Sequence, residues 1–222
     1  MSSPSAALLG WDSPASVLPD RPGKIIVIGR NYSDRVDVDG APPTPLAVFF
    51  KPSTSLVGTG QSVQLPPGIG DVRFEGELAV VIGMRCKNVR PDDFREVVLG
   101  YTCADDVTAW EVGTATGHWS KAKGFDTFCP LGPRVVRDLD PTNVVIRTRV
   151  NGQIRQEGNT SQLVRSVPQL ISEVSSLMTL EPGDVLLTGT PAGAGVLHPG
   201  DSVEVEIEGI GSLVHTVERA AA

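Results

Sequence analysis

Short apolar runs of strand length, separated by turn-forming residues, dominate the pattern of this chain. The runs are rich in aliphatic and β-branched residues and end at glycine, proline or polar residues, as strands do. Near the end of the chain, valine and isoleucine alternate with glutamate, which indicates one buried and one solvated face. The pattern predicts strands at Lys24–Ile28, Leu46–Phe50, Leu78–Ile82, Val144–Val150, Val185–Leu187, Val203–Ile207 and Leu213–Val217.

Two segments have the pattern of helices. Pro91–Leu99 begins with proline and two aspartates, which suit the positive end of a helix as caps, and Gly100 follows as a stop. Val167–Met178 is the longer helix, with Ser166 and Gln169 as a capping box. Its predicted buried face comprises Leu170, Ile171, Val174, Leu177 and Met178.

Composition favours a β-rich protein of mixed α+β class. Glycine and proline number 24 and 18 among 222 residues, and aromatic residues are only 5%, as expected for many strands and tight turns. Asn151-Gly152 is a strong hairpin signal after one of the strands. We expect an irregular N-terminal arm over residues 1–23, one domain over residues 24–222, and a loop at Val36–Pro45 able to act as a lid.

Charge and cysteine content exclude several kinds of partner. A net charge of −7 argues against a nucleic-acid ligand, and the longest apolar runs are far too short to span a membrane. The three cysteines form no C-x-x-C pair, so neither a zinc site nor a disulfide framework is indicated. We therefore expect a soluble, unexported protein of the reducing cytoplasm.

Glu75 and Glu77 stand at the start of the predicted strand Leu78–Ile82. Successive strand residues point to opposite faces, so the two carboxylates share a face, with α-carbons roughly 6.5–7 Å apart. Two solvated glutamates on an exposed edge are one interpretation, and on this stretch alone the favoured one. Two carboxylates that converge on a metal ion are the other.

Asp106 changes this balance, because it follows a second apolar segment, Tyr101–Ala104. Three carboxylates form an all-oxygen site suited to Mg²⁺ or Mn²⁺, which leaves positions for a chelating 2-oxo acid or β-diketone. Lys123 is a candidate to hold a substrate carboxylate or developing negative charge, although an ordinary surface lysine explains its spacing better. Thr188–Gly195 is a glycine-rich turn after a strand, in which Gly189 and Thr190 either present N–H and hydroxyl groups to an oxyanion or are structural.

Six motifs in order resemble the fumarylacetoacetate hydrolase family over about residues 24 to 217. They are Gly29-Arg30-Asn31-Tyr32, Phe74-Glu75-Gly76-Glu77-Leu78, Asp106-Val107-Thr108-Ala109, Lys123-Gly124-Phe125-Asp126-Thr127-Phe128, Val150-Asn151-Gly152 and Thr188-Gly189-Thr190-Pro191. The resemblance implies rolled, stacked β-sheets with few short helices, a homodimer, and a divalent metal held by Glu75, Glu77 and Asp106. It also implies that Lys123 and Thr190 face a small oxo-acid or diketone substrate. Family members hydrolyse, decarboxylate or isomerise such compounds through a metal-bound enolate.

Three departures from the family pattern concern catalysis and substrate binding. Hydrolytic members carry a histidine and a glutamate that activate water, whereas Arg35 and Val38 stand at these positions and neither can act as a general base. Trp110 replaces an arginine, which indicates a less charged or larger ligand, or that Arg35 supplies the charge. His118 is a candidate replacement acid or base, although a structural histidine is the better-supported interpretation.

We therefore expect an enzyme that forms an enolate from a small oxo acid or diketone, by decarboxylation or tautomerisation more than by hydrolysis. Arg30 and Tyr32, which follow the first strand, are expected to bind substrate together with Arg35, Trp110 and Gly189. Two alternatives are an enzyme for a bulkier biosynthetic intermediate and a metal-binding protein without turnover.

Overall fold

The computed structural model describes residues 21–35 and 45–221 of the chain, without the side chain of Arg35. The predicted N-terminal arm falls mostly outside these residues. So does most of the loop predicted at Val36–Pro45, and both therefore stay predictions.

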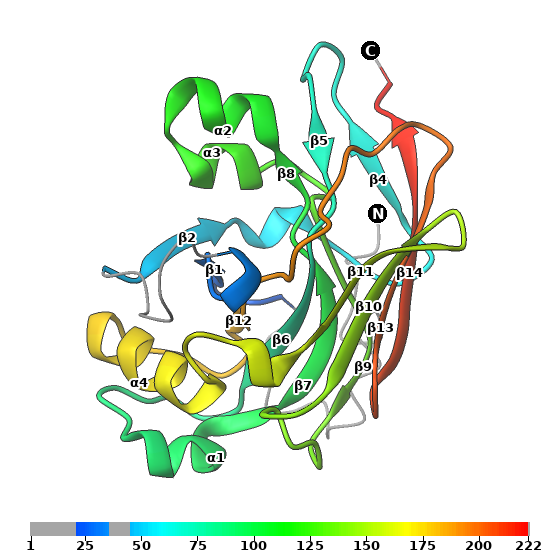
Figure 1. Cartoon of the computed structure of the whole chain (residues 1–222). Helices are drawn as coiled ribbons and strands as arrows, with labels where there is room; N and C mark the ends of the chain where they lie inside the picture. The colour runs from blue at the N-terminus through cyan, green and yellow to red at the C-terminus, as the bar shows by residue number, and fades with distance from the viewer. Residues whose placement is uncertain (1–20, 36–44, 222) are drawn as a thin grey trace.

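A seven-stranded mixed sheet forms the centre of the molecule (Figure 1). Its strand order is β2-β1-β12-β6-β7-β9-β3, in which β1 pairs with β12 and β3 with β9 in parallel and the other pairs are antiparallel. The strands are β1 (Ile25–Gly29), β2 (Ala47–Lys51), β3 (Leu56–Val57), β6 (Gly76–Ile82), β7 (Val98–Asp105), β9 (Cys129–Val136) and β12 (Val185–Leu187).

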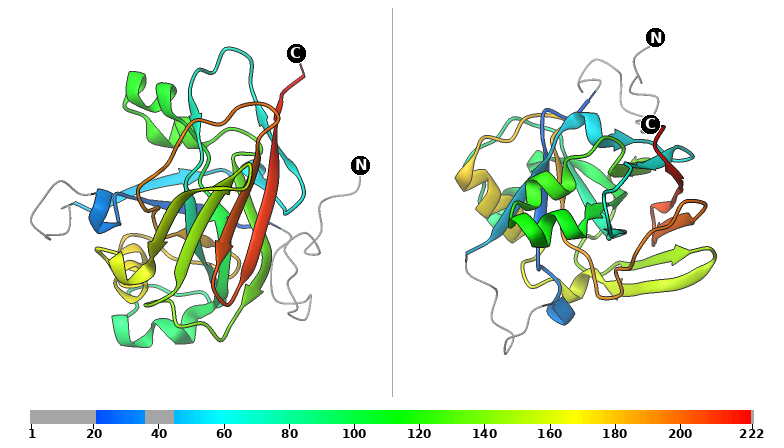
Figure 2. Two further views of the ribbon diagram at one scale, coloured as in Figure 1. Left: turned by 45° about the vertical axis from the view of Figure 1, so that its right-hand side comes forward. Right: turned by 90° about the horizontal axis from the view of Figure 1, so that it is seen from above.

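A second, five-stranded sheet curves beside the first, with β14 along one side in both figures (Figures 1 and 2). Its order is β11-β10-β13-β14-β4, from β4 (Ser62–Leu65), β10 (Val145–Val150), β11 (Gln153–Asn159), β13 (Ser202–Ile207) and β14 (Gly211–Arg219). The predicted hairpin connects β10 and β11, and both turn residues, Asn151 and Gly152, have the positive φ angles that such a turn requires, 52° and 77°. A further pair, β5 (Val72–Arg73) with β8 (Thr108–Ala109), leads into the short helices.

The helices lie at two ends of the sheets. In Figures 1 and 2, α2 (Trp110–Thr116) and α3 (Trp119–Lys123) stand together above the sheets, and Figure 1 shows α1 (Phe94–Val97) and α4 (Val167–Leu177) near the opposite end. None of the helices in the described part of the chain is long and apolar enough to cross a bilayer.

Three details of the helix predictions are wrong. The helix predicted at Pro91–Leu99 is a 3₁₀ turn (Pro91–Asp93) followed by α1, and it ends early because Val98 pairs with Ile82 in the ladder of β7 and β6. Asp93 forms an ion pair with Arg90 and makes no capping hydrogen bond with its side chain. In α4, Leu170, Ile171 and Val174 are buried as expected, but Leu177 is 61% exposed because it lies in the final turn.

Alternate residues of the central strands enter different cores. Leu78, Val80 and Ile82 of β6 pack in the main core, which also holds the buried face of α4 and inward residues of the second sheet. Ala79 belongs to a smaller core on the other face, with Ala104 of β7. Burial on both faces explains why the run Leu78–Ile82 is continuously apolar. The strand-rich fold with few short helices is the class that the sequence predicts.

Candidate metal centre and active site

Three buried carboxylates meet at the paired ends of β6 and β7. The ladder of these strands places Gly76 opposite Asp105 and continues with a hydrogen bond of 2.8 Å from Asp106 N–H to the Glu75 carbonyl. Glu75 and Glu77 are two residues apart and so point to the same side. One oxygen each of Glu75, Glu77 and Asp106 lies within 4.8 Å of the others, which is the grouping that the sequence predicts.

Two buried lysines accompany the carboxylates. Nζ of Lys123 lies 3.0 Å from Glu75 Oε2 and 2.8 Å from Thr108 Oγ1, and it also contacts Asp106 Oδ2. Nζ of Lys51 lies 2.9 Å from Asp106 Oδ1 and within 2.9 Å of the carbonyl oxygens of Val107, Lys123 and Phe128. Lys123 is therefore no ordinary surface lysine, and its three N–H groups already have acceptors.

Burial and like charge give these groups unusual acidities. Burial, with the neighbouring Asp106 and Glu75 carboxylates, raises the pKa of Glu77 well above its usual value. Burial also disfavours the ionised Asp106, but Lys123 and Lys51 outweigh it and lower the pKa of that carboxyl. Burial opposes the ammonium of Lys123 in the same way, and the Asp106 and Glu75 carboxylates overcome it and raise the pKa of Lys123. Two cations do not fully compensate three carboxylates here, which favours a further positive ion.

Side chains from the second sheet hold this cluster in place. Nε2 of His215, on β14, lies 2.8 Å from Oδ2 of Asp105, and Oδ1 of Asp105 accepts a 2.7 Å hydrogen bond from the Glu75 N–H. Gln156, on β11, accepts from the Gly76 N–H at 3.0 Å and donates to Thr190 Oγ1 and to the Pro191 carbonyl, both at 2.8 Å. His215 therefore supports the cluster from the second sheet.

The glycine-rich turn after β12 contacts the carboxylates through its backbone. Gly189 N–H donates a 2.6 Å hydrogen bond to Glu77 Oε2. The turn needs glycine, because φ is +102° and a Cβ would lie 2.9 Å from the Cβ of Asn31. Thr190 Oγ1 donates to the Gly76 carbonyl at 2.8 Å and accepts from Gln156. The hydroxyl hydrogen of Thr190 is thus already engaged.

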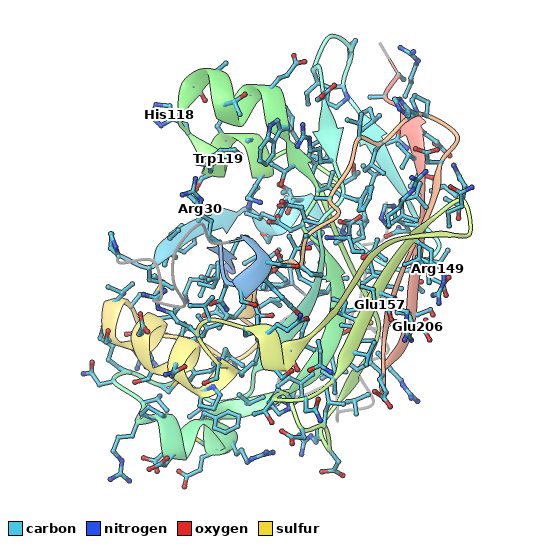
Figure 3. All side chains as sticks on the ribbon, viewed as in Figure 1. Arg30, His118, Trp119, Arg149, Glu157 and Glu206 are labelled. Atoms are coloured by element: carbon cyan, nitrogen blue, oxygen red, sulfur yellow. The ribbon has the colours of Figure 1, made fainter. Side chains whose placement is uncertain are left out.

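A cavity of about 390 Å³ opens above the carboxylates. The three acids, Lys123 and Thr190 line it, and so does the exposed side chain of Arg30. Figure 3 shows Arg30 below Trp119, on the side of the molecule away from Arg149, Glu157 and Glu206. The remaining lining residues are apolar or glycine: Ile28, Gly29, Pro45, Ala47, Phe49, Trp110 and Trp119.

Not all predicted site residues reach this cavity. His118 is exposed at the outer end of α3 and is absent from the lining, so it has no place in the chemistry below (Figure 3). Tyr32 is fully buried in the main core, where burial and the charges of Glu77 and Asp34 raise the pKa of its hydroxyl. Gly189 lies behind Glu77 and does not line the cavity. The side chain of Arg35 lies outside the described structure.

Sequence reasoning missed Lys51, Asp105, His215 and Gln156 as parts of the site. Lys51 does leave a signal, since it is a charged residue at the end of the apolar strand β2. Gln156 and His215 leave none, because each reaches the site from a distant strand through the packing of the two sheets.

Comparison with known proteins identifies the family. The profile for the fumarylacetoacetate (FAA) hydrolase C-terminal domain matches residues 24–218. The mitochondrial oxaloacetate tautomerase FAHD2A of Bos taurus is 42% identical over 210 residues, 89% of this chain and 67% of that protein. The chain therefore belongs to the fumarylacetoacetate hydrolase family.

Solved structures of related enzymes share the fold. A 5-carboxymethyl-2-hydroxymuconate delta-isomerase from Mycobacterium smegmatis is 45% identical with a TM-score of 0.86, over 91% of this chain and 79% of that one. A maleylpyruvate hydrolase from Sphingobium sp. SYK-6, solved with manganese(II) and pyruvate, is 34% identical with a TM-score of 0.79, over 90% and 72%. The homologues are thus tautomerases, isomerases and hydrolases.

Proposed function

We propose that this protein is a divalent-metal-dependent enzyme that converts a small 2-oxo acid between its keto and enol forms, a step shared with decarboxylation of oxo diacids. The observation that carries the proposal is the acidic cluster of Glu75, Glu77 and Asp106 on the floor of a cavity of about 390 Å³. The similarity to an oxaloacetate tautomerase and to a muconate isomerase supports this type of reaction.

The donor set fits Mg²⁺ or Mn²⁺. Its members are carboxylate oxygens, which these hard cations prefer. Burial, and after it the neighbouring Asp106 and Glu75 carboxylates, raise the pKa of Glu77, and a bound cation would offset both effects. Glu75, Glu77 and Asp106 would hold the ion, which when bound supplies a Lewis acid that polarises the substrate carbonyl.

Charge in the cavity selects an anionic substrate. Lys51 and Lys123 offset two of the three carboxylates, so one divalent cation makes the floor net positive. Arg30 adds an exposed positive charge to the cavity lining and is placed to bind a substrate carboxylate.

Lys123 stabilises negative charge that develops on the substrate. Its raised pKa keeps it protonated, and Glu75, Asp106 and Thr108 fix its ammonium in the cavity wall. A fixed charge needs no reorganisation during reaction, which is the arrangement that favours catalysis. Thr190 orders the cavity wall through Gly76 and Gln156.

Carbon–carbon bond hydrolysis is the second candidate, since the chain also resembles a maleylpyruvate hydrolase. We rank it lower because hydrolysis needs an activated water, and Arg35 and Val38 replace the histidine and glutamate that serve hydrolytic members. His118 cannot replace them from its position outside the cavity lining.

The decisive test follows the loss of enol oxaloacetate by ultraviolet absorbance, with Mn²⁺ and with EDTA. Wild-type protein and the exposed-site control Asp92→Asn should both accelerate ketonisation only with metal, and Asp106→Asn should not. NMR of separate incubations with acetylpyruvate and with oxaloacetate tests for hydrolysis and decarboxylation. Acetate with pyruvate from acetylpyruvate indicates hydrolysis. Pyruvate from oxaloacetate above the metal-only rate indicates decarboxylation. Metal-independent activity, or full activity of Asp106→Asn, would refute the proposal.

The resemblance also leads us to propose a homodimer. Light scattering after size-exclusion chromatography tests it, and a monomer mass at micromolar concentration would contradict it.

A further inference from the structure

Three aromatic residues, Phe49, Trp110 and Trp119, line the same cavity as the acidic cluster and are called the aromatic wall here. The Trp110 and Trp119 rings meet edge to face, with centroids 5.2 Å apart at 61°, and the Phe49 and Trp119 centroids are 6.5 Å apart. All three rings are half-buried and all three line the cavity. Part of their apolar surface is therefore turned toward the space that a ligand occupies.

The wall is a built structure, since each ring is held by its own element. Phe49 belongs to β2 and Trp119 begins α3. Trp110 begins α2, and its backbone N–H donates a 2.8 Å hydrogen bond to the Asp71 carbonyl. Gly113 of α2 allows the contact with Trp119, because a Cβ there would lie 2.6 Å from that indole. The rings cannot readily turn away to hide their apolar surface from water.

Arg73 stacks on Trp110. Its guanidinium carbon lies 4.2 Å from the centre of the Trp110 ring, and Arg73 is not among the residues that line the cavity. This cation–π contact adds to the packing that holds the indole in place.

A compact dicarboxylate leaves this wall uncovered. The cation site and Arg30 serve its two carboxylates, whereas the three rings of the wall carry no charge that could pair with either. The cavity volume of about 390 Å³ lies within the roughly 300–1,000 Å³ of pockets that enclose larger organic ligands.

From this division of the cavity, we infer that the substrate is a 2-oxo acid with a planar apolar substituent, aryl or conjugated, that packs against Phe49, Trp110 and Trp119. The inference rests on the proposed function, because the acidic floor and its metal hold the oxo-acid end. Trp110 and Phe49 are then the residues that determine specificity.

Binding of two probes tests the inference separately from catalysis. Pyruvate and phenylglyoxylate share the oxo-acid group and differ in a methyl against a phenyl substituent. Calorimetric titration, with Mn²⁺ and again with EDTA, should show phenylglyoxylate binding roughly 10- to 100-fold more tightly, as expected for burial of one ring. Cyclohexylglyoxylate, of similar size but not planar, should bind more weakly than phenylglyoxylate.

Substitutions in the wall should remove this preference. Trp110→Leu and Phe49→Leu should each lower the phenylglyoxylate-to-pyruvate affinity ratio by at least about fivefold and leave pyruvate binding within about twofold. Phe50→Leu is the matched control, since Phe50 is 40% exposed and does not line the cavity. If Trp110→Leu fails to fold, Phe49→Leu and the wild-type ratio still decide the matter.

Three results would overturn the inference: similar affinities for both probes, equally tight binding of the saturated analogue, or an unchanged ratio in both variants. Each is distinct from failure of the proposed function. That failure would be the absence of metal-dependent ketonisation in protein that nevertheless binds the aryl probe.

Discussion

Nε2 of His215 lies 2.8 Å from Oδ2 of Asp105, and both side chains are fully buried. His215 belongs to the five-stranded sheet and Asp105 to the seven-stranded sheet, so this contact joins the two sheets directly beside the acidic cluster. Because Asp105 also accepts from the Glu75 N–H, the contact fixes a candidate metal ligand through one intermediate residue.

Replacement of His215 by leucine should therefore affect both stability and metal binding. Loss of the imidazole leaves a buried carboxylate oxygen without its partner, which should cost about 1–3 kcal/mol in the free energy of unfolding. Mn²⁺ affinity, measured by electron paramagnetic resonance, should fall because Glu75 is held less firmly. His198→Leu, at an exposed position, should change neither quantity. Lower stability with unchanged Mn²⁺ affinity would show that the contact serves the fold alone.

Glu77→Gln should stabilise the metal-free protein at neutral pH. The pKa of Glu77 in the folded protein is raised above its usual value near 4.5. At pH values between the unfolded and the folded pKa, the folded state therefore binds more protons than the unfolded state. Wild-type stability should therefore fall as pH rises through this window, by at most about 1.4 kcal/mol per pH unit. The glutamine variant, which has no such proton to lose, should lack this part of the fall.

Thermal melts from pH 5 to 8 in EDTA, repeated with Mn²⁺, test this prediction. Mn²⁺ should raise the melting temperature of wild-type protein and of Glu96→Gln, an exposed control, but hardly that of Glu77→Gln. A glutamine variant less stable than wild-type protein in EDTA at pH 8 would be inconsistent with a destabilising Glu77 charge.

Lys51→Met should destabilise the protein by about 3–5 kcal/mol, because Asp106 then loses a buried cation and three carbonyl oxygens lose their donor. Lys51→Arg should not restore stability, since a planar guanidinium cannot replace the point-like ammonium among these acceptors. Chemical denaturation measures both effects, and Lys121→Met on the exposed side of α3 is the control. A loss below about 1 kcal/mol in Lys51→Met would contradict the structural assignment.

The three cysteines should differ sharply in reactivity. Burial raises the pKa of Cys103 and of Cys129 to about 12, so at pH 8 roughly one molecule in ten thousand carries a thiolate at either position. Cys86 is only partly buried. A disulfide reagent should modify at most one thiol in the native protein and three after denaturation, and Cys86→Ser should abolish the native reaction. Rapid modification of two or more native thiols would disprove this.

Seven strands of the described residues and the acidic cluster were predictable, because both depend on local order. Alternation and apolar runs follow from side-chain direction in a strand, and Glu75 and Glu77 share a face for the same reason. Asp106 could be added because it ends the neighbouring apolar segment, which proved to be the antiparallel partner β7.

What could not be predicted depends on contacts between distant segments. The helix expected at Pro91–Leu99 is cut short because Val98 finds a ladder partner in Ile82, and strand pairing overrides local preference there. His215 and Gln156 look like ordinary polar residues on strands, and only the curvature of the second sheet brings them to the first.

The acids lie on or next to strands in the interior of the sheet, whereas the aromatic rings lie at its edge and on short helices. β6 and β7 are interior strands, paired on both sides, whereas Phe49 lies on the edge strand β2 and the two tryptophans begin short helices. Mutations in the wall thus leave the backbone pairing beneath the cation site intact. A gene of this kind can diversify toward new substrates by changing a few codons at the periphery, and a mutagenesis library aimed at altered selectivity is best confined to positions 49, 110 and 119.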